Sequence, residues 1–125
     1  MTVRFTDREL DVMNVLWRHG PATVTDVRKH LDDELAYTTV LTILRILEDK
    51  GHVGHAEHGK AHKYFAKVDE SHARSTALTR LVDRVFGGSA ELLLTQLVSD
   101  RKLSAKELKR VRAFMDAQIK RSRKS

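Results

Sequence analysis

Apolar residues recur three and four positions apart through almost all of this 125-residue chain, and the spacing changes to that of strands only between residues 52 and 67. Three- and four-residue spacing places side chains on one face of a helix, whereas alternation places them on one face of a strand. A chain of this length suits one compact domain, or two small ones that share a core, and excludes a large multidomain enzyme. The sequence therefore predicts a mainly α fold with a small β-hairpin.

The part of the chain before the hairpin predicts three helices. A Thr6–Glu9 capping box opens the first, over residues 7–18, with Trp17 in its buried stripe. A second, short helix is expected to be capped by Thr25-Asp26. The third helix is expected over residues 38–50, with four apolar residues facing inward: Val40, Ile43, Leu44 and Leu47.

The hairpin is predicted from two alternating segments, residues 52–57 and 62–67, joined by the four-residue connection 58–61 with a glycine to turn it. Helix, helix, helix and hairpin, with a short extended piece after the first helix, is the order of a winged helix-turn-helix. The hairpin is then the wing. We therefore predict a winged-helix DNA-binding domain over residues 1–68.

From residue 69 the pattern is helical again, with breaks at Gly87-Gly88 and at a second capping box, Ser104–Glu107. Three helices of about 55 residues have too little volume to bury their own apolar stripes, so a second copy of the chain is the expected partner. This predicts a three-helix dimerisation region over 69–121, followed by a disordered basic tail at 122–125. The expected dimerisation residues are Leu78, Leu81, Val82, Val85, Leu94, Leu97, Leu108, Val111 and Met115.

The third helix offers a short polar face suited to base recognition. With its apolar residues turned inward, Thr38, Thr42 and Arg45 share the opposite face, and Thr39 lies beside them at the helix N-terminus. Threonine offers a hydroxyl and a methyl to base edges, and arginine offers a fork for guanine or phosphate. The alternative is that a threonine-rich first turn merely starts a helix, but the hairpin that follows favours contact with double-stranded DNA.

Charge placement supports a phosphate partner for the wing. Residues 1–68 carry 10 Lys/Arg and 10 Asp/Glu, so the net charge of +6 comes from residues 69–125 and the total alone says nothing about the wing. Within residues 50–67, however, four lysines including Lys60 and Lys63 face one acid, Glu57. Phosphate contacts of this kind position a protein without specifying sequence. Lysines also protect solvated edge strands, and both roles are compatible.

Four histidines, His52, His55, His58 and His62, crowd the same segment. Residues three apart on a strand point to opposite faces, so His52 and His55 are expected to diverge, and convergence would need His58 to meet His62. A metal-responsive regulator using these histidines remains an alternative function, as does a protein-binding winged-helix adaptor. The preferred interpretation is partly protonated imidazoles beside phosphate, which predicts tighter DNA binding at pH 6 than at pH 8.

Catalytic patterns are missing from the sequence. The paired carboxylates Asp32-Asp33 fall in a turn without a predicted pocket, and no glycine-rich loop precedes a helix with a Lys-Ser/Thr pair. The chain has no cysteine, which leaves a reducing cytoplasm as its expected location, and apolar runs are too short for a membrane span. We expect no enzyme activity, no cofactor, no metal and no membrane association.

The chain resembles the penicillinase repressor family of BlaI/MecI-type winged-helix regulators. The matching segments are Thr6–Trp17, Ala36–Val40, Leu47–Gly51, Gly59–Tyr64 and Leu103-Ser104. The resemblance implies a homodimeric, cytoplasmic transcriptional repressor on a palindromic operator, controlling genes of the antibiotic-resistance type. The residues it implies for DNA binding are Tyr37, Thr38, Thr39, Thr42 and Arg45 in the recognition helix and Lys60, His62 and Lys63 in the wing.

Two positions depart from the family pattern. Ile46 stands where the family usually has arginine. Some members are inactivated by a sensor protease that cuts an Asn-Phe bond, and the aligned pair here is Gln96-Leu97. By alignment, the resemblance implies a sensor protease as a partner and puts Gln96-Leu97 at the proteolysis site, but the missing Asn-Phe pair counts against inactivation by that route. A copper-responsive variant, which uses a C-terminal cysteine cluster, does not match this chain.

Overall fold

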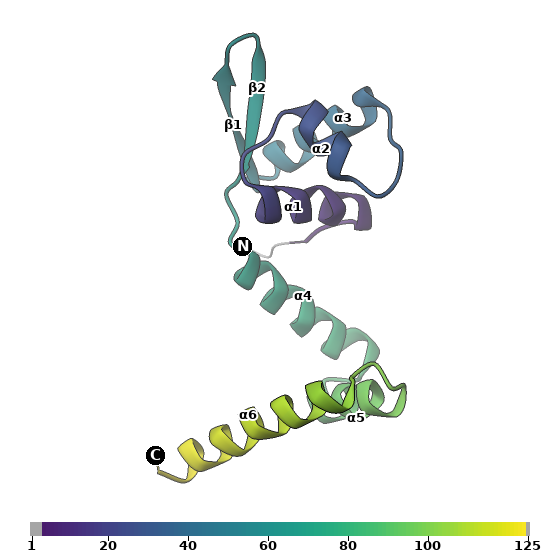
Figure 1. Cartoon of the computed structure of the whole chain (residues 1–125), viewed down its shortest axis with the longest axis vertical. Helices are drawn as coiled ribbons and strands as arrows, with labels where there is room; N and C mark the ends of the chain where they lie inside the picture. The colour runs from purple at the N-terminus through teal and green to yellow at the C-terminus, as the bar shows by residue number, and fades with distance from the viewer. Residues whose placement is uncertain (1–3, 125) are drawn as a thin grey trace. The chain divides into compact units, whose positions relative to one another are not determined.

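The computed structural model describes residues 4–124, which form helices and one antiparallel two-stranded hairpin (Figure 1). Two compact units divide between Thr79 and Arg80, within α4, and each is described by itself. The bounds are α1 Asp7–His19, α2 Val24–His30, α3 Tyr37–Asp49, β1 Val53–His58, β2 Ala61–Ala66, α4 Glu70–Val85, α5 Ala90–Ser99 and α6 Ala105–Lys124. The mainly α fold with one wing hairpin is confirmed. The proposed functional boundary at 68–69 stays a prediction.

The N-terminus of α2 differs from the expectation. Thr23, not Thr25-Asp26, is the cap: its hydroxyl accepts from the amide of Asp26 at 3.1 Å, and the Asp26 carboxylate accepts from the amide of Thr23 at 3.5 Å. A reciprocal box satisfies two otherwise free amides, which a cap at Thr25 would not do. Ala22, just before it, pairs with Tyr64 of β2 through bonds of 2.9 and 2.8 Å, and this keeps the chain extended up to the cap.

The core of the N-terminal unit lies between α1, α2 and α3 and is closed by the foot of the hairpin. The inward face predicted for α3 is confirmed, since all four of its apolar residues are buried. Val53 of β1 and Tyr64 of β2 are buried against the same cluster. Trp17, expected in the core, is only half-buried, because its indole nitrogen donates to the carbonyl of Val68 at 2.9 Å at the edge of that core.

A charged cluster joins the start of α1 to the end of α3. The Glu9 carboxylate is buried, and it accepts from Lys50 Nζ at 2.8 Å and from the amide of Thr6 at 2.7 Å. Burial raises the pKa of this carboxyl, but the Lys50 ammonium and the Thr6 amide outweigh burial and hold the pKa below its usual value. Beside it, His52 is buried under the ring of Phe5, with ring centroids 5.0 Å apart.

His52 makes folding stability depend on pH. Burial, reinforced by the Lys50 charge, lowers the pKa of His52. Below a pH of about 6.5, His52 therefore binds a proton in the unfolded chain but not in the folded chain. The contribution of His52 to the free energy of unfolding is complete above that pH and is lost as pH falls through the pKa of His52 in the folded chain. We expect the urea midpoint to fall between pH 7.5 and pH 5.5, and to fall less in His52→Gln. An equal fall in both proteins would contradict this assignment.

The C-terminal unit has helices with unburied apolar faces. No residue of α5 or α6, as far as Lys124, is buried, and both carry large exposed apolar side chains. Gly87 and Gly88 have φ of +57° and +84°, so the predicted break there is confirmed.

The structure of the basic tail differs from the one expected from the sequence. Residues 122–125 were expected to be disordered, yet α6 continues through Lys124, because arginine and lysine are good helix formers and favour the negative end of a helix. Ser125 lies outside the described residues. Within residues 4–124, no helix combines the length and apolarity needed to span a bilayer.

Candidate nucleic-acid interface

The polar face of α3 is exposed. Its apolar residues pack into the core on one side, and this turns Thr38, Thr42 and Arg45 to the other side, where all three side chains are exposed. Thr39 is exposed as well, and Tyr37, in the first turn, is 48% exposed. The Thr42 hydroxyl donates to the carbonyl of Thr38 at 2.8 Å, which leaves its oxygen lone pairs and methyl group available.

The N-terminus of α3 has no side-chain cap, since Ala36 precedes it. First-turn amides without a partner attract anions, and the positive end of the helix adds to this attraction. The other helices described between residues 4 and 124 begin with a side chain that accepts from a first-turn amide: Thr6, Thr23, Asp69, Ser89 and Ser104. α3 therefore combines two features: free amides at its N-terminus and an exposed polar face.

A groove runs between α3, the start of α2 and the hairpin. It brings together four of the residues expected to bind DNA, Tyr37, Arg45, Lys60 and His62. The lining also includes His55, which the sequence expected beside phosphate as one of the four wing histidines, and residues that the sequence did not single out for DNA binding, namely Thr23, Thr25, Glu48 and Tyr64. Thr25 follows the true cap of α2, so recognising the Thr23–Asp26 box would have placed it at an exposed helix start.

The hairpin register separates the expected wing residues. Tyr64 pairs with His55 and His62 pairs with Glu57, so these four share one face of the ribbon. Lys63 pairs with Ala56 and belongs to the other face, away from the lining of the groove. The strands extend to His58 and Ala61, which leaves Gly59-Lys60 as a two-residue turn in place of the four-residue connection that we expected.

His52 and His55 diverge as expected, but the pair of histidines that meets differs from the expected one. His52 is buried and His55 is exposed, but it is His55, not His58, that meets His62: the rings stack with centroids 4.5 Å apart and planes 16° apart. The register causes this, because His55 lies diagonally across from His62 on the same face. Within the described chain, no three His, Cys, Asp or Glu side chains are grouped so as to hold a metal ion.

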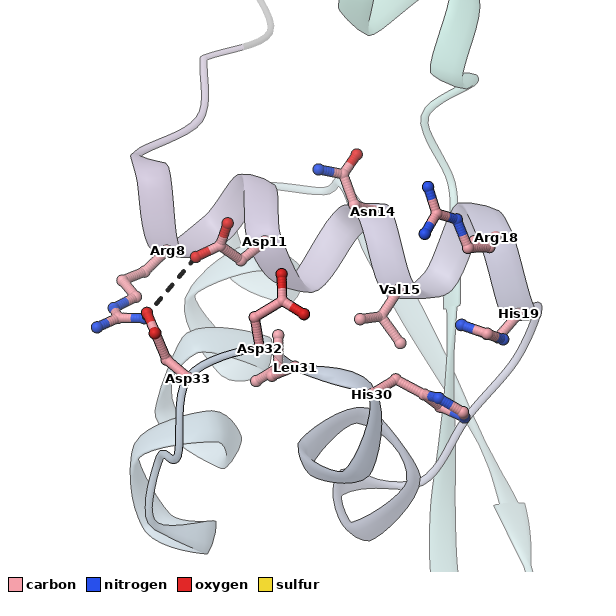
Figure 2. Close-up of a pocket in the computed structure, with 10 residues that line it drawn as sticks. All are labelled: Arg8, Asp11, Asn14, Val15, Arg18, His19, His30, Leu31, Asp32 and Asp33. Carbon is pink, nitrogen blue, oxygen red and sulfur yellow. Dashed lines mark hydrogen bonds and ion pairs between the residues drawn. The ribbon is translucent and has the colours of Figure 1, made fainter.

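A second cleft, between α1 and the end of α2, does contain the paired acids that we expected to lack a pocket (Figure 2). Figure 2 shows Asp32 and Asp33 near Arg8 at one end and the stacked rings of His19 and His30 at the other. Arg8 pairs with Asp33 at 2.6 Å and so ties the turn after α2 to α1. Three carboxylates, those of Asp11, Asp32 and Asp33, make this cleft a poor place for phosphate.

A helix with an exposed polar face and uncapped N-terminal amides lies beside a basic two-stranded hairpin. This combination defines a winged-helix DNA-binding protein. The comparisons make this assignment specific: the chain belongs to the penicillinase repressor family, whose model matches residues 5–117. It is therefore a DNA-binding transcriptional repressor and not an enzyme.

The individual relatives agree. The chain is 26% identical to the penicillinase repressor of Bacillus licheniformis over 107 residues, and the aligned region covers 84% of each chain. It is 34% identical over 110 residues to the transcriptional regulator BlaI of Mycobacterium tuberculosis, covering 72% of this chain and 80% of that one. Among solved structures, the DNA-binding domain of the repressor BlaI matches at 32% identity with a TM-score of 0.51, over 57% of this chain and 89% of that one.

Proposed function

We propose that the protein is a homodimer that represses transcription by occupying a palindromic operator, with one winged helix on each half-site about one helical turn apart. The exposed polar face of α3, with its free N-terminal amides, is the observation that carries this proposal. By analogy with relatives described as penicillinase repressor and methicillin resistance regulatory protein, its target genes are of the antibiotic-resistance type.

In this proposal α3 reads bases through Thr38, Thr39, Thr42 and Arg45, with Tyr37 beside the first-turn amides. The wing holds the sugar-phosphate backbone through Lys60 at its tip and His62 on the face toward the groove, and Lys63 reaches phosphate from the other face.

The second copy supports the C-terminal helices in this proposal. Apolar side chains remain exposed along α5 and α6, and burying such faces is the main driving force for association. The proposed dimer residues are Leu78, Leu81, Val82, Val85, Leu94, Leu97, Leu108, Val111 and Met115. Val82, Leu97 and Val111 are half-buried within one copy, so they would support the interface from beneath.

Inactivation by a sensor protease at Gln96-Leu97 completes the proposal. Both residues lie inside α5, and the Gln96 amide donates to the Asp100 carboxylate at 3.0 Å. A helical bond does not fit a protease cleft in extended form, so cleavage here would require local unfolding of α5.

Substitutions in α3 and in the wing should have different signatures. Thr42→Ala or Arg45→Ala should cost about 1–3 kcal/mol on the operator and relax sequence preference, because base contacts are lost. Lys60→Ala should weaken binding to all duplexes alike and flatten the dependence on salt. Titrations of operator and scrambled duplexes at several salt concentrations measure both effects. If Lys60→Ala changed preference and Thr42→Ala did not, the two roles would be reversed.

Footprinting of the purified protein on DNA upstream of its own gene tests the function directly. We expect one protected region with two-fold sequence symmetry, because a two-fold dimer presents the same surface twice. Binding that neither protects a site nor weakens steeply with salt would reject a DNA-binding repressor in favour of a protein-binding adaptor.

A further inference from the structure

Glu48 and His55 connect the recognition helix to the wing. Glu48 lies on α3, one turn beyond Arg45, and His55 lies on β1. His55 Nδ1 is 2.5 Å from Glu48 Oε2, and the two side chains are 36% and 31% exposed. Among the residues that the structure describes, this is the only hydrogen bond between a side chain of α3 and a side chain of the hairpin. Both residues line the groove.

Aromatic neighbours hold the His55 ring in place. His62 stacks on it, and the Tyr64 ring lies 5.6 Å away, centroid to centroid. Tyr64 is in turn buried in the core and paired with Ala22. The ring is therefore held by three side chains, Glu48 of α3 and His62 and Tyr64 of β2, so its position is defined.

Glu48 carries the one carboxylate among the described residues that line the groove. Its negative charge is unfavourable for the binding of DNA phosphate that we propose there. Burial raises the pKa of the Tyr64 phenol and the Glu48 charge raises it further, so that charge reaches across the foot of the wing. The other charged or titratable groups that line the groove around His55 are Arg45, Lys60, His62, Tyr37 and Tyr64. A proton on His55 would cancel the Glu48 charge and convert their contact into a charge-assisted hydrogen bond.

We propose that Glu48 and His55 form a proton-linked brace that positions the wing against α3, and that operator binding takes up a proton on His55. The proposal rests on the proposed function and names the residue pair through which pH acts. With the proton bound, the wing is held firmly and Glu48 is neutralised. Without it, an uncompensated carboxylate faces phosphate. Both residues position the wing, and Glu48 acts in addition through its charge in the groove.

The test compares the operator affinity at pH 6 with that at pH 8, at fixed ionic strength, for the full-length protein and its variants. The probes are the footprinted duplex and a scrambled duplex of equal length. Each variant is compared with itself at the two pH values, so a general loss of affinity does not imitate the result. His58→Gln is the matched control, because His58 is a wing histidine outside the brace. Circular dichroism verifies that every variant is folded.

We expect wild type and His58→Gln to bind the operator about fivefold more tightly at pH 6 than at pH 8. His55→Gln and Glu48→Gln should each lose most of this ratio, and the double variant should resemble either single one. His55→Lys, which carries a permanent charge opposite Glu48, should bind tightly with no pH dependence. His58→Lys, the control for added charge, should bind all duplexes more tightly and keep the ratio.

Two results would overturn the brace: a full pH ratio in His55→Gln, or a full ratio in Glu48→Gln, which would mean that His55 acts on phosphate directly. A wild-type protein that prefers the operator but shows no pH ratio would also overturn it. Failure of the proposed function is recognised separately, because wild type would then not distinguish the operator from the scrambled duplex at either pH.

Discussion

Met115→Glu should convert the protein to a monomer. Met115 lies on the apolar stripe of α6 with Leu108 and Val111, and its side chain is 38% exposed in one copy. Burying an unpaired carboxylate in an interface costs roughly 3–5 kcal/mol, which weakens association by about 100- to 4000-fold. The affinity for the operator should also fall, because one dimer would no longer bind both half-sites at once. Analytical ultracentrifugation measures the association, and footprinting measures the occupancy.

Ala117→Glu is the matched control for this substitution. It adds the same charge to the same helix two residues away, and successive positions of a helix rotate so that residue 117 lies nearly opposite residue 115. We expect it to remain dimeric. A dimer in both variants, or a monomer in both, would show that the stripe through Met115 is not the interface.

Leu44→Ala should remove a large share of the stability of the winged helix. Leu44 is fully buried between the elements that form the core, so the substitution loses apolar burial and leaves a cavity, together about 2–5 kcal/mol. The whole stability of a small domain is about 5–15 kcal/mol, so a large share is at stake. Urea unfolding, monitored by circular dichroism, measures the loss.

Ile46→Ala, two residues away on the same helix, is the control because Ile46 is 43% exposed. It removes a comparable aliphatic side chain from the surface and should cost far less than Leu44→Ala. Equal losses at the two positions would contradict the orientation of α3, and with it the exposure of its polar face.

Local patterns predicted most of the elements. Glu9 three residues after Thr6 predicted the start of α1, and the spacing of Val40, Leu44 and Leu47 predicted which side of α3 faces the core. The α2 cap was missed although its residues obey the same rule, because the box Thr23–Asp26 ends in aspartate where glutamate or glutamine is usual.

The sequence by itself determined the order of helices and hairpin and the polar face of α3, because these depend on the spacing of residues close together in the chain. Only the tertiary structure decided that His55 reaches Glu48 and stacks on His62, that the buried Glu9 pairs with the exposed Lys50, and that Lys63 lies on the other face from His62. Those relations depend on strand register and on packing between segments far apart in the chain. A shift of one residue in the register would exchange the faces of the wing.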